Sequence, residues 1–486
     1  MQRIIDIKDG VTRMPEWRMA QPVNFELLDG ENIAIAGPNG GGKSMFVDII
    51  TGKHPLLGDC IKYDFTPSTK EYISDNIKYV CFKDTYGGDN DSTYYLQQRW
   101  NQTEIDPETA TVGSRLEAAY QAAGDDTEER RQLQQHIYEL FGLEQMLDKY
   151  VILLSSGELR KLVIASSIFS QPRLLIIDNP YIGLDKEARE QLTNLLQILS
   201  TEHGIQIMLI VNRTKDIPEF VSHVVEVSNM TVGRKMTRSE YMAQQQPDCA
   251  PANIPDNWRQ MIEDMPYKEE EYDAQRVVDM HKVSIRYGER TILKDLDWQV
   301  MNGEYWALTG RNGSGKTVLM KCICGFLRPT SGTVKIFDKT IGTDCDFAPN
   351  TGMLIETPGF LAHETGMNNL KWLAKLGKGA SGEKVADLIR LVGLDPSMKK
   401  KVGQYSLGMR QRLGIAQALL DDPALLILDE PMNGLDKNGV KDIRALLLDL
   451  KVQGKTILLA SHFAQDIDEL CDTVHEMDQG IICQME

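Results

Sequence analysis

Gly310–Thr317 reads GRNGSGKT and matches the pattern GxxxxGK[ST]. An apolar run with strand character, Tyr305–Thr309, comes directly before it, and the segment after it, Val318–Phe326, can form a helix. Between a strand and a helix, glycines let several backbone N–H groups turn toward one anion, and the helix N-terminus adds its positive dipole. The stretch is therefore predicted to be a phosphate-binding loop. A glycine-rich turn that precedes a helix by chance is the disfavoured alternative.

Two side chains of this loop have predicted roles in binding a nucleotide. Lys316 is expected to reach the β- and γ-phosphates, and Thr317 is expected to offer its hydroxyl to Mg²⁺. The other residues of the loop that we expect to contact the nucleotide are Gly310, Asn312, Gly313 and Gly315.

A second loop of the same kind lies in the first half of the chain. The sequence GPNGGGKS at Gly37–Ser44 follows the strand-like run Asn32–Ala36. Its last two residues, Lys43 and Ser44, match the last two of the loop described above. The other residues of this loop that we expect to contact a nucleotide are Gly37, Asn39, Gly40 and Gly42.

Three further motifs follow each loop in the same order, so the chain contains an internal repeat. They are LSSGE at Leu154–Glu158 and YSLGM at Tyr405–Met409, LLIIDNP at Leu174–Pro180 and LLILDEP at Leu425–Pro431, and GLD at Gly183–Asp185 and Gly434–Asp436. Residues 157 and 408, 178 and 429, and 185 and 436 are each 251 apart, whereas the loop lysines 43 and 316 are 273 apart. The first copy therefore has 22 extra residues between its loop and its LSSGE turn, and the polar stretch Tyr86–Glu108 is the candidate insertion.

Length and composition restrict the class of protein. With 486 residues, the chain is expected to form two or more domains, and its net charge of −17 argues against broad electrostatic binding to nucleic acid. No apolar run approaches the roughly 18–20 residues of a membrane span. We expect no signal peptide at the N-terminus. The eight cysteines are scattered and complete no zinc set, so reduced thiols in the cytoplasm are expected.

With four ordered motifs in each half, the chain resembles the ATP-binding cassette (ABC) ATPases over nearly its whole length. The resemblance implies an α/β fold of two tandem P-loop NTPase (ABC nucleotide-binding) domains, each an α/β core plus a helical subdomain that carries the signature. The expected domains are residues 1–232 and 275–486. Residues 233–274 are expected to form an acidic linker, shorter and richer in proline than the helical linkers of the ABC-F translation factors.

The resemblance also implies how the sites are completed. In this family, two cassettes enclose two ATP molecules, and each ATP lies on the loop of one cassette and under the signature of the other. The signature residues are Ser155, Ser156 and Gly157 in the first half and Ser406, Leu407 and Gly408 in the second. Each Mg²⁺ is expected to meet a loop hydroxyl and a strand-end aspartate, namely Thr317 and Asp429, or Ser44 and Asp178.

The second-half loop has the residues expected of a hydrolytic site. Glu430 is placed to act as general base on the attacking water, and Lys316 and His462 are expected to contact the γ-phosphate. Tyr287 resembles the aromatic residue that stacks on adenine. Glu356 stands near the position of the family's usual glutamine, where it is expected to touch Mg²⁺ or a partner. The alternative for Asp429 and Glu430 is a solvated acidic pair.

The first-half loop lacks these residues. Asn179 stands where the glutamate is expected and cannot usefully accept a proton at neutral pH, and Asn212 stands where the histidine is expected. Met14 matches Tyr287, with Trp17 nearby as another candidate. The glutamine position falls near Phe82, and two further glutamines, Gln97 and Gln98, cannot be placed. This site is expected to bind nucleotide but to hydrolyse it poorly or not at all.

The two halves resemble different branches of the family. The first half, with IDNPYIGLD and NRTKDIPEF, resembles the twin-cassette ATPases linked to molybdate uptake. From about Arg311, the sequence resembles bacitracin- and lantibiotic-type exporter ATPases, in which IExPxF precedes a helical region. A mosaic junction near residue 311 and ordinary divergence both remain open.

The resemblance leaves two functions open. The first is a cytoplasmic ATPase, using ATP and Mg²⁺ and peripheral on the inner face of the membrane, that energises a transporter made by permease subunits in separate chains. The second is a regulator or translation-type factor with twin cassettes and no transport role. Both imply that the two cassettes of one chain pair with each other. A twin ATPase of the DNA-repair type is not supported, because the cysteine spacing gives no zinc module.

Overall fold

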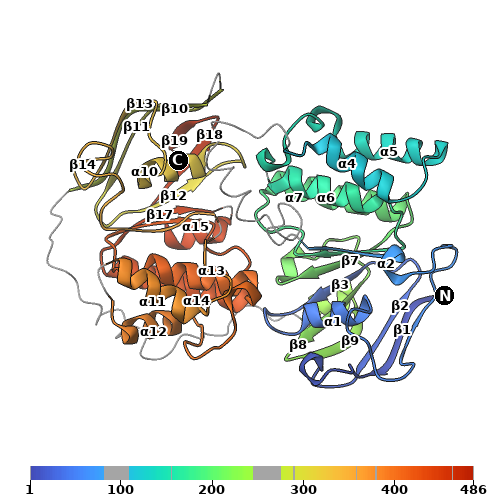
Figure 1. Ribbon diagram of the computed structural model, residues 1–486. Coiled ribbons are helices and arrows are strands. Elements are labelled where there is room, and N and C mark those ends of the chain that lie inside the picture. The colour runs from blue at the N-terminus through green and yellow to red at the C-terminus, as the bar shows by residue number, and fades with distance from the viewer. Residues whose placement is uncertain are drawn as a thin grey trace. The chain divides into compact units, whose positions relative to one another are not determined.

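The computed structural model describes residues 2–81, 109–154, 156–244, 275–287, 290–356, 358–377, 380–461 and 463–484. The chain divides into two compact units, residues 1–249 and 250–486. Figure 1 shows that each unit contains a central β-sheet with helices packed against it. Among the described residues, no helix combines the length and the apolar character that crossing a membrane requires.

The first unit is built on a six-stranded sheet. In spatial order, its strands are β5 (Ile77–Cys81), β6 (Leu174–Asp178), β7 (Gln206–Val211), β3 (Ile33–Ala36), β8 (His223–Ser228) and β9 (Thr231–Thr237). The first five are parallel and β9 is antiparallel to β8. Every residue of β6 and β7 is buried, which is typical of parallel strands covered on both faces.

A small antiparallel sheet and two groups of helices cover the faces of this sheet. The small sheet has the order β2 (Val23–Leu28), β1 (Arg3–Gly10) and β4 (Ile61–Tyr63). The helices are α1 (Lys43–Ile50), α2 (Ile73–Asn76), α4 (Val112–Ala122), α5 (Glu128–Phe141), α6 (Ser156–Ile168), α7 (Lys186–Thr201) and α8 (Arg238–Gln244), with 3-10 turns η1 (Pro15–Trp17), η2 (Glu144–Met146), η3 (Val151–Leu153) and η4 (Thr214–Asp216). One core joins α4, α5, α6 and α7 to the sheet, and a second joins α1 and the small sheet to its other face.

The second unit repeats this plan. Its six-stranded sheet has the order β15 (Thr351–Leu354), β16 (Leu425–Asp429), β17 (Thr456–Ala460), β12 (Tyr305–Thr309), β18 (Thr473–Asp478) and β19 (Ile481–Gln484). The antiparallel sheet has the order β11 (Arg290–Met301), β10 (Arg276–Tyr287), β13 (Ser331–Ile336) and β14 (Lys339–Thr340). The helices are α10 (Lys316–Cys324), α11 (Gly366–Leu376), α12 (Gly382–Leu391), α13 (Leu407–Ala418), α14 (Lys437–Val452) and α15 (Ala464–Leu470), with the turn η5 (Val402–Gln404).

The GLD motifs start equivalent helices in the two units. Asp185 accepts a hydrogen bond from the backbone N–H of Ala188 at 2.9 Å, and Asp436 accepts one from Gly439 at 2.8 Å. Each carboxylate thereby caps the N-terminus of its helix, α7 or α14, where its charge also complements the helix dipole.

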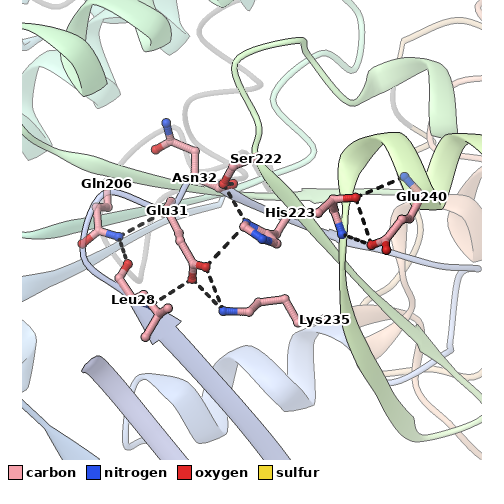
Figure 2. A network of polar contacts seen from close by, with 9 residues as sticks. Leu28, Glu31, Asn32, Gln206, Ser222, His223, Lys235 and Glu240 are labelled. Carbon is pink, nitrogen blue, oxygen red and sulfur yellow. Dashed lines mark hydrogen bonds and ion pairs between the residues drawn. The ribbon is translucent and has the colours of Figure 1, made fainter. Parts of the chain in front are cut away.

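A polar network lies at one end of the strands of the first sheet (Figure 2). Lys235 Nζ lies 2.7 Å from Glu31 Oε2, and His223 Nδ1 lies 3.5 Å from Glu31 Oε1. Gln206 Nε2 donates to the carbonyl oxygens of Leu28 and Glu31 at 2.8 and 2.9 Å. Because Glu31 lies just before β3, the network holds this strand at the end opposite the loop Gly37–Ser44, and its role is structural.

The first unit extends beyond the expected boundary at residue 232. Residues 233–237 complete β9, in which Thr237 pairs with His223 of β8, and α8 packs against β8 and β9. Residues 233–244 thus belong to the first unit and not to the linker. The half-buried polar sequence of this edge strand gave no clear strand pattern, and its ladder with β8 is what orders it. The rest of the expected linker and the candidate insertion Tyr86–Glu108 lie outside the described residues.

Candidate nucleotide-binding sites

The loop of the second unit joins β12 to α10, as the sequence predicts. Gly310, Gly313 and Gly315 have φ angles of 125°, 81° and 112°, a region that favours glycine. A Cβ atom on Gly310 would lie 2.2 Å from the carbonyl oxygen of Met477, so the backbone passes too close to β18 for a side chain. The glycines therefore shape the loop, and Gly315 caps the N-terminus of α10.

The ammonium group of Lys316 lies inside this loop. Its Nζ donates to the carbonyl oxygens of Gly310 and Arg311 at 2.6 and 2.9 Å, and only 7% of the residue is exposed. A buried cation is costly unless its donors are satisfied, and the loop carbonyls satisfy them here. The charge is thus held where an anion bound by the loop would meet it.

Thr317 and Asp429 come together as expected. The Thr317 hydroxyl donates to Asp429 Oδ2 at 2.9 Å, although the two residues are 112 positions apart. Burial raises the pKa of Asp429, the nearby Glu356 carboxylate raises it further, and the Thr317 hydrogen bond and the charges of Lys316 and Lys321 oppose the rise. A hydroxyl and a carboxylate side by side fit Mg²⁺, which prefers oxygen ligands.

Glu430 follows Asp429 on a constrained turn. Its φ angle is 50°, in the left-handed region that non-glycine residues rarely adopt. Its N–H donates to the carbonyl oxygen of Ala460 at 2.9 Å, and its own carbonyl accepts from Gln411 Nε2 at 3.0 Å. Strain of this kind is typical of functional sites, and the two hydrogen bonds fix the backbone from which the Glu430 side chain starts.

Two side chains that the sequence did not single out contact this site. Gln411 is buried on α13, the helix that begins with the signature, and its position five residues after Ser406 was the available signal. Lys321 Nζ lies 2.9 Å from Glu356 Oε1, so the carboxylate expected to touch Mg²⁺ or a partner forms an ion pair in the structure.

The second-half signature packs against its own GLD turn. Ser406 caps α13 by accepting a hydrogen bond from the N–H of Met409 at 3.3 Å, and Gly408 is buried in the first turn. Gly434 has a φ angle of 74°, and a Cβ atom there would lie 2.6 Å from Cγ of Leu407. The start of the signature helix is therefore fixed to the segment that follows Glu430.

The loop of the first unit has the same geometry. Gly37, Gly40 and Gly42 have φ angles of 149°, 78° and 106°. Lys43 Nζ donates to the carbonyl oxygens of Gly37 and Pro38, both at 2.7 Å. A Cβ atom on Gly37 would lie 2.1 Å from the carbonyl oxygen of Val227, just as one on Gly310 would meet Met477. The two loops can thus bind phosphate in the same way.

The strand-end aspartate of the first unit has different neighbours. Asp178 accepts from the Tyr79 hydroxyl at 3.0 Å on Oδ2 and from Asn179 Nδ2 at 2.6 Å on Oδ1. Cys81 Sγ lies 3.7 Å from the same Oδ2. Ser44 is exposed and, in the described part of the chain, makes no hydrogen bond to Asp178. The pair predicted to hold a metal here is therefore not brought together as it is in the second unit.

Asn179 retains the backbone of its counterpart Glu430. Its φ angle is also 50°, and its N–H donates to the carbonyl oxygen of Ile210 at 2.8 Å. The position matching Gln411 holds Arg160, whose guanidinium donates to the carbonyl oxygen of Ile182. The difference between the two sites thus lies in the side chains and not in the strand-end turn.

The remaining predicted residues are described only in part. Ser155, His462, Phe82, Gln97 and Gln98 lie outside the described residues, as do the side chains of Ser156 and Tyr287.

Four other predicted positions of the first unit are described. Gly157 lies in the first turn of α6, and the amide oxygen of Asn212 is buried with no hydrogen-bond partner in the described ranges. Met14 is 49% exposed, and Trp17 stacks on His54 with ring centroids 4.2 Å apart, so Trp17 already has an aromatic partner.

Comparison with known proteins identifies the family. The model described as ABC transporter matches residues 20–182 and 293–433, one range in each half and together more than half of the chain. The chain therefore belongs to the ABC transporter family of ATP-binding proteins, and it is an ATPase with two cassettes.

Individual relatives agree with this conclusion. BcrA, a bacitracin transport ATP-binding protein of Enterococcus faecalis, is 40% identical over 42% of this chain and 67% of its own. SrtF, a lantibiotic transport ATP-binding protein of Streptococcus pyogenes, is 37% identical over 40% of this chain and 84% of its own. An uncharacterized ABC transporter ATP-binding protein of Schizosaccharomyces pombe is 26% identical over 94% of both chains. The predicted twin cassettes and the likeness to bacitracin and lantibiotic ATPases are confirmed, and the molybdate-linked likeness stays a prediction.

Solved structures share the fold across both units. A ribosome-bound archaeal Pelota and ABCE1 model covers 94% of this chain and 74% of its own, with a TM-score of 0.62 and 18% identity. The RNase-L inhibitor covers 94% of this chain and 86% of its own, with a TM-score of 0.55 and 21% identity. At these identities the likeness concerns the fold alone, and it confirms the predicted α/β fold of tandem nucleotide-binding domains.

Proposed function

We propose that this chain binds two ATP molecules, hydrolyses ATP mainly at the second-half loop, and energises a membrane transporter whose membrane subunits are separate chains. The proposal that the two sites are unequal rests on Glu430 and Asn179. The two residues have the same backbone conformation, but only Glu430 has a carboxylate. That each half's signature completes the site on the other half's loop stays a prediction from the family resemblance.

The second-half site has the groups needed for hydrolysis. Lys316 and the loop N–H groups hold the phosphates, and the Glu430 carboxylate accepts the proton of the attacking water. Mg²⁺, held by Thr317 and Asp429, would neutralise charge on the β- and γ-phosphates. Gln411 fixes the backbone from which the Glu430 side chain starts, which supports general-base catalysis.

The first-half site is proposed to bind and retain nucleotide. Lys43 and the glycine loop have the geometry of their counterparts, whereas Asn179 offers an amide that cannot serve as base. Nucleotide retained after rapid desalting tests this assignment. In a Lys316→Ala chain loaded with ATP, we expect the retained nucleotide to remain ATP, and ADP with released phosphate would contradict the proposal.

Transport coupling is supported by relatives and by exposed apolar side chains. The bacitracin and lantibiotic relatives are transport ATP-binding proteins. Near the start of the helical region of the second unit, Leu361, Trp372 and Leu376 are 50%, 55% and 86% exposed, which favours a protein partner. A regulator or translation-type factor without transport is the alternative, and full-length fold likeness to ABCE1 and the RNase-L inhibitor motivates keeping it.

Co-purification of the tagged chain from solubilised membranes separates the two functions. We expect a multi-span subunit to co-purify with the wild-type chain and to be lost from a Trp372→Glu variant that still binds ATP. Leu448→Glu changes an exposed apolar residue of α14 and is the matched control. Recovery of the chain with ribosomes and no membrane subunit would favour the translation-type factor.

A further inference from the structure

The hydrogen bonds on Asp178 distinguish the first site in a way that the missing carboxylate does not explain. We propose that Tyr79 and Asn179 occupy the oxygens of Asp178, so that the first site binds nucleotide with little dependence on Mg²⁺. This inference rests on the proposed function, in which the first site binds nucleotide, and adds that the site is specialised for nucleotide with little or no metal.

Both oxygens of the Asp178 carboxylate have donors. The Tyr79 hydroxyl lies 3.0 Å from Oδ2 and the Asn179 amide nitrogen lies 2.6 Å from Oδ1. Hydrogen bonds to an ionised carboxylate are stronger than those between neutral groups. Asp178 is only 8% exposed, so water competes weakly for these oxygens.

The strand register explains why tyrosine reaches this carboxylate. Tyr79 pairs with Ile176 and Cys81 pairs with Asp178 in the parallel ladder of β5 and β6. Side chains two residues apart on a strand point to the same face, so the Tyr79 ring extends along β6 toward Asp178. The hydroxyl and the Cys81 thiol then meet the same oxygen, Oδ2.

The second unit has no hydroxyl at the matching position. There, Met353 pairs with Ile427, and Asp429 follows two residues later, as Asp178 follows Ile176. Met353 carries no O–H group, and Asp429 Oδ2 instead accepts from Thr317, a loop residue. The aspartate of the second unit is thus coupled to its nucleotide loop, whereas Asp178 is coupled to β5.

The donor set around Asp178 does not fit Mg²⁺ as well as the set around Asp429. Mg²⁺ demands near-ideal octahedral geometry and oxygens that are free to face it or its waters. Mg²⁺ bound at Asp178 would compete with the phenol and the amide for the carboxylate oxygens. Lys43 and the loop N–H groups remain as the groups that neutralise phosphate charge, and their action needs no metal.

Nucleotide binding with and without metal tests the proposal on the full chain. Lys316→Ala disables the second loop, so a fluorescent ATP analogue reports the first site. We expect its dissociation constant to change by less than about 3-fold between Mg²⁺ and EDTA. In the Lys316→Ala, Tyr79→Phe chain, we expect Mg²⁺ to tighten binding on the order of 10-fold, because a hydrogen bond to a charged group is lost. Tyr72→Phe changes an exposed tyrosine of the same unit and should behave like the parent.

A second measurement needs no change at Tyr79. Mn²⁺ replaces Mg²⁺ as a spectroscopic probe, and its affinity in the presence of the nucleotide is compared between the Lys316→Ala and Lys43→Ala chains. We expect Mn²⁺ to bind at least about 10-fold more weakly when only the first loop is intact. Equal affinities, or a strong Mg²⁺ requirement that Tyr79→Phe leaves unchanged, would overturn the inference alone. A first loop that binds no nucleotide under either condition would overturn the proposed function and the inference together.

Discussion

The two strand-end turns of this molecule have the same backbone conformation, but one carries the carboxylate of Glu430 and the other carries the amide of Asn179. Glu430 and Asn179 both have a φ angle of 50°, and both donate their N–H to the neighbouring parallel strand. A turn that was shaped only by catalysis would be expected to relax once the carboxylate is absent. Its retention in the first half indicates that the sheet and the nucleotide loop require it, so the fold of a cassette and its chemistry are set by different residues.

Several side chains around these two turns differ between the halves. In the second half, Gln411 donates to the Glu430 carbonyl and Thr317 donates to Asp429. In the first half, Arg160 donates to the carbonyl oxygen of Ile182 and Tyr79 donates to Asp178. The first-half site therefore differs from the second-half site by more than the replacement of Glu430 by Asn179. In the first-half site, a polar contact joins Asp178 to the neighbouring strand. In the second-half site, the polar contacts join Asp429 to the nucleotide loop and fix the backbone of the general base.

The loop lysines offer the largest expected contrast between the halves. Lys316→Ala should lower steady-state ATP hydrolysis by about 100-fold or more, because the phosphates lose a positioned cation. Lys43→Ala should lower hydrolysis much less while releasing the nucleotide retained at the first loop. Phosphate release and retained nucleotide, measured on both variants, check this contrast. Equal loss of hydrolysis in the two variants would contradict it.

Gln411 offers a smaller contrast that concerns positioning. Gln411→Ala should lower kcat by about 10-fold and change KM little, since a displaced catalytic group can cost up to about 100-fold in rate. Arg160→Ala, at the matching position of the first half, should leave kcat nearly unchanged. Steady-state kinetics over a range of ATP concentrations separates kcat from KM. A raised KM with an unchanged kcat in Gln411→Ala would show that Gln411 does not position the base.

The smallest expected effect is the pH dependence of the stability of the second unit, which involves His475. The His475 ring is buried, stacks on Trp306 with centroids 4.3 Å apart, and has an Nδ1 with no hydrogen-bond partner in the described ranges. Burial lowers the pKa of His475 below its usual value. The unfolded chain therefore binds the proton more readily, and this residue's contribution to stability is lost as pH falls below about 6.5.

Thermal unfolding between pH 7.5 and 5.5 measures this effect. The transition of the second unit should depend less on pH in His475→Phe, which keeps the aromatic stack, than in the wild-type chain. His363→Phe, at an exposed histidine of the same unit, is the control. An identical pH dependence in wild type and His475→Phe would contradict the assignment.

Local sequence was sufficient for the loops. The strand–loop–helix order and the glycine positions follow from the loop motifs and the runs that flank them, and the structure places the Thr317 hydroxyl on Asp429 as expected. The family resemblance carried by the repeated motifs also implied an α/β core in each half, and each unit contains a six-stranded sheet.

Contacts made through strand pairing could not be predicted in this way. Tyr79 meets Asp178 only because β5 lies beside β6 in a register that places them together, 99 positions apart. Lys321 and Glu356 are 35 positions apart and pair because α10 and the segment after β15 converge. The expected linker includes residues 233–237 of the half-buried strand β9, because an edge strand with a polar sequence lacks a clear alternation.

The comparison of Glu430→Gln with Asn179→Gln tests the one-site account most directly. Both variants place the same amide at matching turns; Glu430→Gln keeps the shape of its side chain, and Asn179→Gln lengthens its side chain by one methylene group. Steady-state ATP hydrolysis should fall by about 10²–10⁴-fold in Glu430→Gln, the usual contribution of general-base catalysis, and should stay near the wild-type rate in Asn179→Gln. Equal losses in the two variants, or a fully active Glu430→Gln, would contradict the account.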